Sequence, residues 1–216
     1  RSLAVVGGGA AGFEIVLALE HRNRTRFGAG GAISFRLVAE SAAILPGFPE
    51  RVRRAAERRL REQGIEVVSG SAASLVDAFG LTLASGARVP AEQVVLATGA
   101  QAPPLYRNAG LETDAHGFIA VDATLRSRSH PGVFASGDIA AVLEHPRPKS
   151  GVFAVRQGPP LTRNLRRALA NQVPLPFVPQ RNALALLSTG RKHAIATRAR
   201  LVIEGDWVWR WKDHID

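Results

Sequence analysis

The chain has 216 residues, a formal net charge of +10 and a mean hydropathy of +0.01, which are typical of a globular protein with one large or two small domains. It contains no cysteine, which excludes disulfides, thiolate metal sites, redox cysteine pairs and cysteine nucleophiles. No apolar run approaches the roughly 18 to 20 residues that span a bilayer, and no signal-peptide pattern is present, so we expect a cytoplasmic protein.

The chain opens on an apolar run that breaks into a glycine-rich turn and then a helical pattern. In this setting, Gly7 permits the tight turn, Gly9 lets the backbone approach a diphosphate, and Gly12 lets the helix pack close to the strand. The first helical N–H groups, at Ala10 and Ala11, are then directed at the phosphates. The motif predicts dinucleotide binding; the alternative is a glycine turn that binds nothing.

An acidic residue follows the second predicted strand. The first helix is expected to end near Arg24, with a loop over 25–31 and a buried strand over 33–39 that ends at Glu40. Glu40 lies 28 residues beyond Gly12, and the loop accounts for this long spacing. A carboxylate there accepts hydrogen bonds from an adenosine 2′-hydroxyl and repels a 2′-phosphate, which predicts NADH in preference to NADPH. The alternative is an ordinary solvated carboxylate.

A strongly basic segment, 51–61, is predicted to form an amphipathic helix that Gly64 caps. Its apolar side chains share one face. We interpret its opposite face as solvated; binding to nucleic acid or to an anionic membrane is the alternative that we consider weaker. The arginines of this segment are Arg51, Arg53, Arg54, Arg58, Arg59 and Arg61.

The rest of the chain alternates short strands and turns, with one long helix. A third strand at 65–68, a β-meander from 72 to 83 and a buried strand at 94–97 complete the first domain. Domain boundaries are expected at 1–97, 98–172 and 173–216. The second region begins with a proline-rich linker and includes a helix from about 151 to 170. The third is a β-rich tail.

Three tryptophans in the tail, Trp207, Trp209 and Trp211, share one face if their segment is a strand. They then pack against the domain or a partner, or they dock at a membrane interface. The six histidines are scattered without ligand spacing, so no metal site is expected. No methionine is present and a strand begins at the second residue, so we expect further residues to precede Arg1.

Three motifs, in this order, resemble those of the flavin-dependent pyridine nucleotide oxidoreductases, which are built from two nested Rossmann domains. They are the glycine turn 7–14, Ala97-Thr98-Gly99, and the segment 131–138 that ends in Asp138. The resemblance implies an α/β fold: a Rossmann-type NAD-binding domain followed by the C-terminal half of an FAD-binding domain. Thr98 and Gly99 would mark the return to the FAD domain, and Asp138 would bind the ribityl chain of FAD. Alternatively, Asp138 only caps a helix that starts at Ile139.

Narrower resemblances concern the reaction and the tail. The segment 154–158 resembles the AxxQG segment of type II NADH dehydrogenases, which implies that Gln157 lies at the flavin or quinone edge rather than on a helix surface. Glu14 matches a glutamate near the nicotinamide end; its alternative is a carboxylate favoured by the helix dipole. The tail resembles type II dehydrogenase-like domains that are fused to selenide, water dikinase, and its tryptophans suit a protein peripheral to the inner face of a membrane.

The family's first glycine motif, which binds the FAD diphosphate, would precede Arg1. The resemblance therefore implies a complete NAD(H) site and an incomplete FAD site, with the N-terminal FAD half as a missing partner and little activity in this fragment alone. The implied reaction is hydride transfer from NADH to FAD and then electron transfer to a quinone. The alternatives are a reductase of a ferredoxin-like or other soluble acceptor, and a non-catalytic NAD-binding or redox-sensing module. The lack of cysteine argues against disulfide and sulfide:quinone reductases.

Overall fold

A computed structural model describes residues 1–28, 32–199 and 201–215 of the chain. The chain divides into two compact units. Residues 1–99 and 184–216 form the first, and residues 100–183 form the second. The tail thus belongs to the same unit as residues 1–99.

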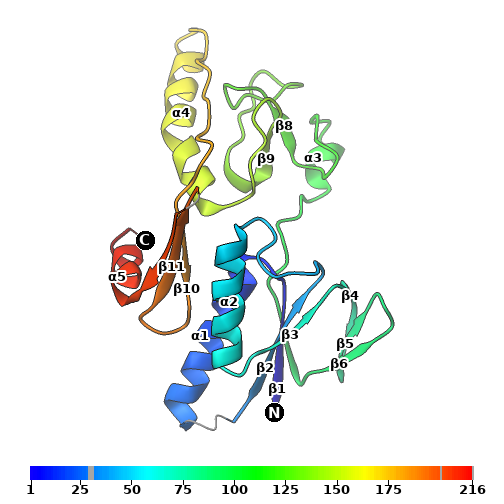
Figure 1. Ribbon diagram of the computed structural model, residues 1–216. Helices are drawn as coiled ribbons and strands as arrows, with labels where there is room; N and C mark the ends of the chain where they lie inside the picture. The colour runs from blue at the N-terminus through cyan, green and yellow to red at the C-terminus, as the bar shows by residue number, and fades with distance from the viewer. Residues whose placement is uncertain (29–31, 200, 216) are drawn as a thin grey trace. The chain divides into compact units, whose positions relative to one another are not determined.

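The first unit is built on a parallel four-stranded sheet with the strand order β3-β2-β1-β7 (Figure 1). Apolar side chains alternate between its two faces, so both faces are covered. Helices α1 and α2 pack on one face, and an antiparallel meander of β4, β5 and β6 covers the other. The elements are β1 (Ser2–Val6), α1 (Ala10–Phe27), β2 (Ser34–Ala39), α2 (Glu50–Glu62), β3 (Glu66–Ser69), β4 (Ala73–Asp77), β5 (Gly80–Leu83), β6 (Arg88–Pro90) and β7 (Gln93–Leu96).

Strand β1 shows how the two cores divide. Val5 joins Phe13 and Leu17 of α1 in the core beneath the helices. Ala4 and Val6 point to the other face and pack against the meander. Because both faces of the strand are covered, its side chains are apolar on both sides. The sheet, the helices and the meander confirm the predicted α/β class with a Rossmann-type core and a β-meander.

Helix α1 is longer than expected. It continues past Arg24 to Phe27, and the N–H of Gly28 donates to the Arg24 carbonyl at 2.9 Å. The prediction of a loop over 25–31 is therefore wrong for residues 25–27. Their polar side chains were interpreted as the end of the helix, but these residues continue it. Residues 29–31 of that loop lie outside the described residues.

Gly64 ends α2 as expected. Its φ of 68° lies in the left-handed region, and the N–H of Ile65 donates to the Leu60 carbonyl at 2.9 Å. Several arginines of this helix have acidic partners: Arg54 pairs with Glu50 at 2.6 Å and Arg58 with Glu204 at 2.6 Å. Part of the basic face is thus neutralised within the first unit.

The tail forms an antiparallel sheet of β10 (Ala185–Ser188), β11 (Ala194–Arg198) and β12 (Leu201–Gly205), followed by helix α5 (Asp206–Ile215). Figure 1 shows this sheet beside α1 and α2. A Cβ at Gly190 would strike the carbonyl group of Leu17, so the β10–β11 turn touches the backbone of α1 directly. The side-chain amide of Gln63 also donates to the Thr189 carbonyl at 3.2 Å.

The strand interpretation of the tryptophan segment is wrong, because this segment is helix α5. Helical spacing keeps Trp207 and Trp211 on one face, at positions i and i+4, and turns Trp209 away from them. Trp209 packs with the small apolar cluster around Val208, whereas Trp207 and Trp211 are 56% and 39% exposed. In the described part of the chain, no helix is both long and apolar enough to cross a membrane.

The second unit contains a short parallel pair of strands and one long helix. Its elements are α3 (Leu105–Asn108), β8 (Ile119–Val121), the single 3₁₀ turn η1 (Gly137–Ile139), β9 (Ala140–Val142) and α4 (Gly151–Leu169). The prediction that a helix starts at Ile139 is wrong, because Ala140 already belongs to β9. Strand pairing with β8 outcompetes the local helical pattern there.

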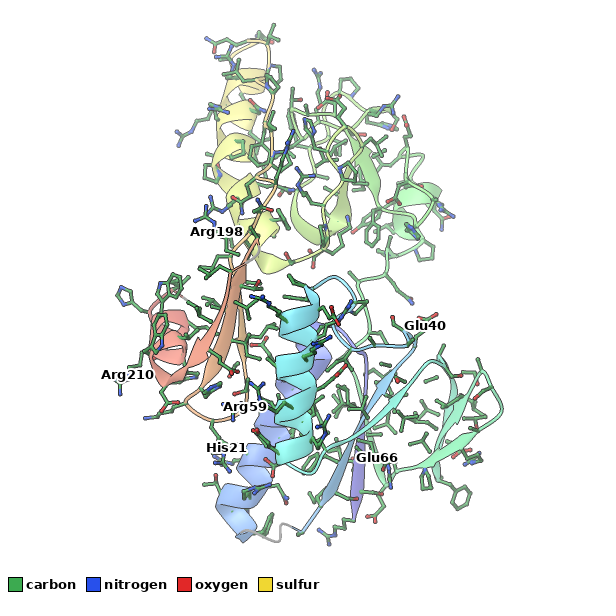
Figure 2. All side chains as sticks on the ribbon, in the orientation of Figure 1. His21, Glu40, Arg59, Glu66, Arg198 and Arg210 are labelled. Atoms are coloured by element: carbon green, nitrogen blue, oxygen red, sulfur yellow. The ribbon has the colours of Figure 1, made fainter. Side chains whose placement is uncertain are left out.

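The tail is held by a hydrogen-bonded network around His193. Arg59 of α2, labelled in Figure 2, lies 2.6 Å from Nε2 of His193, and Thr189 Oγ1 lies 3.0 Å from Nδ1. Arginine can only donate, so Nε2 accepts and the proton sits on Nδ1. Burial lowers the pKa of His193, and the charge of Arg59 lowers it further. The ring is therefore neutral in the folded protein.

We expect His193 to make the fold acid-sensitive. In the unfolded chain this ring takes up a proton below its ordinary pKa of about 6.5, whereas in the folded chain it takes up the proton only at lower pH. The free energy of unfolding is therefore retained above that pH and decreases below it. Thermal melts between pH 7.5 and 5 should show a steeper loss for the wild type than for His193→Gln. His214→Gln, at an exposed histidine of α5, is the control and should keep the wild-type slope. Equal slopes for all three proteins would contradict this assignment.

Candidate functional site

The glycine turn between β1 and α1 is dictated by backbone contacts. A Cβ at Gly7 would strike the carbonyl oxygen of Ala97, and one at Gly12 would strike the carbonyl oxygen of Gly7. Gly7 also has a φ of 138°, which other residues rarely adopt. In contrast, a Cβ at Gly9 would meet nothing within 4 Å. Two of the glycines thus let β1, α1 and β7 meet, and the third leaves space open.

The start of α1 faces this open space. Gly9 is the N-cap residue and is exposed, and the N–H of Phe13 is the first to donate back to it, at 3.1 Å. The N–H groups of Ala10, Ala11 and Gly12 precede the helical ladder and have no acceptor within the helix. The first turn of α1 contains no acidic side chain that would compete for them. This arrangement fits a diphosphate.

Glu40 lies at the same edge of the sheet as the turn. It follows β2 and is exposed (Figure 2), and the N–H of Gly7 donates to the Val38 carbonyl at 2.8 Å, near the end of the same strand. The loop after Glu40 returns to the turn, because the N–H of Leu45 donates to the Gly8 carbonyl at 2.7 Å. Leu45 has a φ of 51° and is fully buried. Sequence analysis missed this clamp, since a leucine in the left-handed region has no sequence signal.

Glu14 lies one turn further along α1 and contacts the tail. Its Oε1 accepts a hydrogen bond from the N–H of Ser188 at 2.7 Å. The carboxylate, half-buried, therefore joins α1 to the end of β10. Sequence analysis did not foresee this contact, because the two residues are separated by 174 positions.

Thr98 and Gly99 follow β7 and are exposed at the boundary of the first unit. The N–H of Ala97 still belongs to the sheet and donates to the Val6 carbonyl at 2.8 Å. A Cβ at Gly99 would meet nothing within 4 Å, so packing does not require a glycine there. The backbone thus leaves the sheet at the end that also presents the glycine turn.

The second unit brings Asp138 and Gln157 together. The N–H of Gly137 donates to Oε1 of Gln157 at 2.6 Å, which joins η1 to α4, and Gln157 is 6% exposed. Asp138 and Gln157 both line a pocket of about 340 Å³ with apolar side chains of β9 and α4. Pockets of this size accept part of a cofactor. The mixture of an apolar lining and a carboxylate fits a ring and a hydroxylated chain.

Lys149 lines the same pocket and was not singled out from the sequence. Its Nζ donates to the Ala140 carbonyl at 2.5 Å and lies 4.0 Å from the centroid of the Phe118 ring. Burial lowers the pKa of Lys149, although Asp114 and Asp138 oppose this effect. A signal was available in the composition: the basic residues are almost all arginine, and the chain's lysines are Lys149, Lys192 and Lys212.

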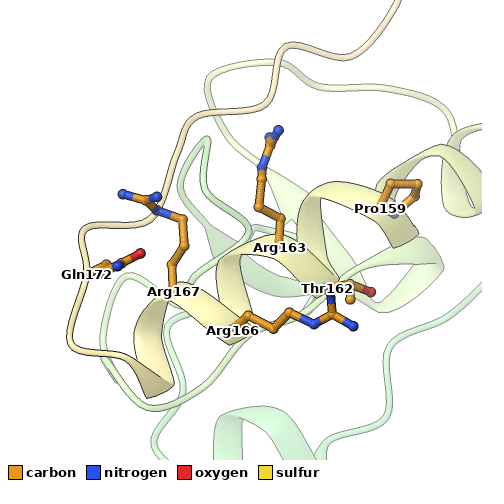
Figure 3. A pocket seen from close by; sticks show the side chains of 6 residues that line it. All are labelled: Pro159, Thr162, Arg163, Arg166, Arg167 and Gln172. Atoms are coloured by element: carbon orange, nitrogen blue, oxygen red, sulfur yellow. The ribbon is translucent and has the colours of Figure 1, made fainter.

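A second, open pocket of about 520 Å³ lies along α4 (Figure 3). Arg167 is tied to the following loop, since its Nε donates to the Val173 carbonyl at 2.6 Å. None of the predicted site residues lies in this pocket. Its lining residues are Pro159, Thr162, Arg163, Arg166, Arg167 and Gln172. Among the residues that the structure describes, no three His, Asp or Glu side chains are grouped so that they could hold a metal ion.

Known proteins resemble this chain over most of its length. A probable NADH dehydrogenase of Dictyostelium discoideum is 31% identical over 90% of this chain and 45% of its own. A type II NADH:quinone oxidoreductase of Haemophilus influenzae is 28% identical over 66% of this chain and 34% of its own. A ferredoxin–NAD(+) reductase component of the p-cumate 2,3-dioxygenase system from Pseudomonas putida is 34% identical over 71% and 35%.

The fold is also known from solved structures. The sulfide:quinone oxidoreductase of Aquifex aeolicus has a TM-score of 0.79 and 17% identity, and the match covers 100% of this chain and 57% of that one. The chain thus spans less than half the length of the three relatives above. The sequence profile of one family, the pyridine nucleotide-disulphide oxidoreductases, matches residues 1–158. The glycine turn and the Asp138 segment both fall within this match, and the chain belongs to that family.

Proposed function

We propose that this chain is part of a flavin-dependent NADH oxidoreductase and that its first unit binds NADH. The observation that supports this most is the turn 7–12, where packing requires glycine at Gly7, Gly8 and Gly12, and Gly9 leaves open space before the amides of α1. Those amides, at Ala10, Ala11 and Gly12, would bind the diphosphate. Glu40 would accept hydrogen bonds from the adenosine ribose. Calorimetric titration of the protein with NADH tests the proposal, which fails if no binding is measured.

The second unit would hold part of FAD, and Thr98 and Gly99 would mark the point where the chain leaves the first unit for it. Bound flavin supplies the acceptor for hydride. Asp138 would accept hydrogen bonds from ribityl hydroxyls, which needs only an ionised carboxylate. The Oε1 of Gln157 is fixed by the Gly137 N–H, and its amide N–H₂ group would donate to the cofactor edge. Glu14 would hold the nicotinamide end by fixing α1 against β10.

A quinone is the electron acceptor that we propose. The likeness to a type II NADH:quinone oxidoreductase supports this choice. A ferredoxin-like protein is the second candidate, favoured by the likeness to a ferredoxin–NAD(+) reductase component. NADH oxidation by the flavin-loaded protein should be stimulated by a soluble quinone; stimulation by ferredoxin alone would favour the second candidate. A colourless protein that binds NADH would favour a redox-sensing module.

Membrane contact and a fused selenide, water dikinase domain remain predictions. The exposed rings of Trp207 and Trp211 suit a membrane interface, since the indole ring is amphipathic. Sedimentation with anionic vesicles would test this contact.

Gly9→Asp should separate binding from folding. Asp is a favourable N-cap residue and the space beside Gly9 is open, so thermal stability should be kept or raised. The added carboxylate faces the bound diphosphate, and NADH affinity should fall by about tenfold or more. Gly9→Asn, a neutral N-cap of similar size, is the control and should lose less affinity. Equal affinities of the Asp and Asn variants, measured by calorimetry, would contradict a diphosphate at this turn.

Glu40→Arg should move the preference from NADH toward NADPH. The guanidinium replaces a carboxylate that repels a 2′-phosphate, and the ratio of the two dissociation constants should change by about tenfold or more. Glu92→Arg makes the same charge change before β7, at the opposite end of the sheet, and should leave the ratio unchanged. An unchanged ratio in Glu40→Arg would remove Glu40 from the ribose site.

A further inference from the structure

Lys149 is a fixed cation in the pocket of the second unit. Two neutral groups hold its ammonium: the Ala140 carbonyl of β9 at 2.5 Å and the Phe118 ring at 4.0 Å. Both contacts immobilise a side chain that would otherwise sample many rotamers, at an entropic cost. The charge is therefore held at one place in the pocket.

This cation has no carboxylate partner at contact distance. In the described part of the chain, no carboxylate oxygen lies within 4.0 Å of its Nζ, whereas several arginines have such partners. Asp114 and Asp138 line the same pocket and attract the ammonium only from farther away. A charge that is partly removed from water without a direct counter-ion is unfavourable unless a ligand compensates it.

The start of α4 adds to this positive potential. Ser150 is the N-cap residue of this long helix and makes no side-chain cap bond, and the N–H groups of Gly151 and Val152 precede the first bonds back to the Ser150 carbonyl. Ser150 and Phe153 line the pocket. The positive end of a helix dipole and the ammonium thus meet there. The other charged or titratable side chains around the pocket are Asp114, His116, Asp138, His145 and Arg147.

The residues that line this pocket also limit the kind of anionic group that can bind in it. Two carboxylates share the pocket and would repel a doubly charged diphosphate. Phe118, Phe153 and the short apolar side chains of β9 suit a flat ring that is neutral when oxidised. A reduced flavin ring carries one delocalised charge, which these carboxylates repel less than the two charges of a diphosphate.

We propose that Lys149 is the cationic partner of the electron-rich edge of the bound flavin and stabilises the negative charge that the ring holds once it is reduced. The inference rests on the proposed function. Bound NADH would supply the hydride, whose transfer would leave NAD⁺ and a reduced flavin that carries the one negative charge of the hydride. Lys149 keeps its proton and contributes only its charge. The ammonium would raise the flavin midpoint potential, because it stabilises the reduced ring more than the oxidised one.

The midpoint potential of the flavin-loaded protein tests this role. Lys149→Gln should favour the oxidised flavin by about tenfold, which lowers a two-electron potential by about 30 mV. Lys149→Arg should restore the charge and most of the potential. Lys192→Gln removes a lysine of the first unit and should leave the potential unchanged. Circular dichroism shows whether the variants fold, and removing a poorly compensated cation should not impair folding.

Differential labelling of amines gives a second readout that is independent of activity. The three lysines of the chain can be followed together by mass spectrometry. Added FAD should slow the modification of Lys149 by about tenfold or more and should leave Lys192 and Lys212 unaffected, because a bound ring blocks the pocket.

The outcomes separate this inference from the proposed function. A full-length wild-type protein, with both parts of its FAD site, that binds no flavin overturns both. A flavin-loaded Lys149→Gln protein with the wild-type potential overturns the inference alone. Weaker FAD binding by that variant with an unchanged potential would assign Lys149 to the diphosphate and also overturn the inference. A lowered potential that arginine restores, with protection of Lys149 by FAD, supports it.

Discussion

The first unit depends on three backbone segments that meet without intervening side chains. Gly7 lies against the Ala97 carbonyl, and Gly12 lies against the carbonyl of Gly7, so β7, β1 and α1 are locked together at one end of the sheet. Every other feature of the candidate nucleotide site is set relative to this contact: the amides of α1, the clamp by Leu45 and the position of Glu40. A single methyl group at Gly7 or Gly12 would force these elements apart.

The two candidate sites obtain their chemistry in different ways. At the glycine turn the ligand would be held by main-chain groups, whose positions are fixed by secondary structure. In the second unit the polar groups are side chains, and each is oriented by a neighbour: Gln157 by the Gly137 N–H and Lys149 by the Ala140 carbonyl. The first site is thus specified mainly by where side chains are absent, and the second by how they are supported.

Much of the fold could be predicted because its signals are local. The glycine turn, the cap at Gly64 and the apolar strands each follow from a few consecutive residues. The features that were missed depend on distant partners. The tryptophan segment becomes helical against β11, Ile139 enters a turn because the next residues pair with β8, and Lys149 gains its environment from Phe118. A local pattern has no information about such partners.

The bond between Glu14 and Ser188 has a consequence for synthesis of the protein. Its donor and acceptor are 174 positions apart, so the first helix leaves the ribosome long before β10 exists. Until then, Gly190 cannot cover the backbone of α1 at Leu17. The nascent chain therefore presents an uncovered helix surface for most of translation, and this high contact order slows the last step of maturation.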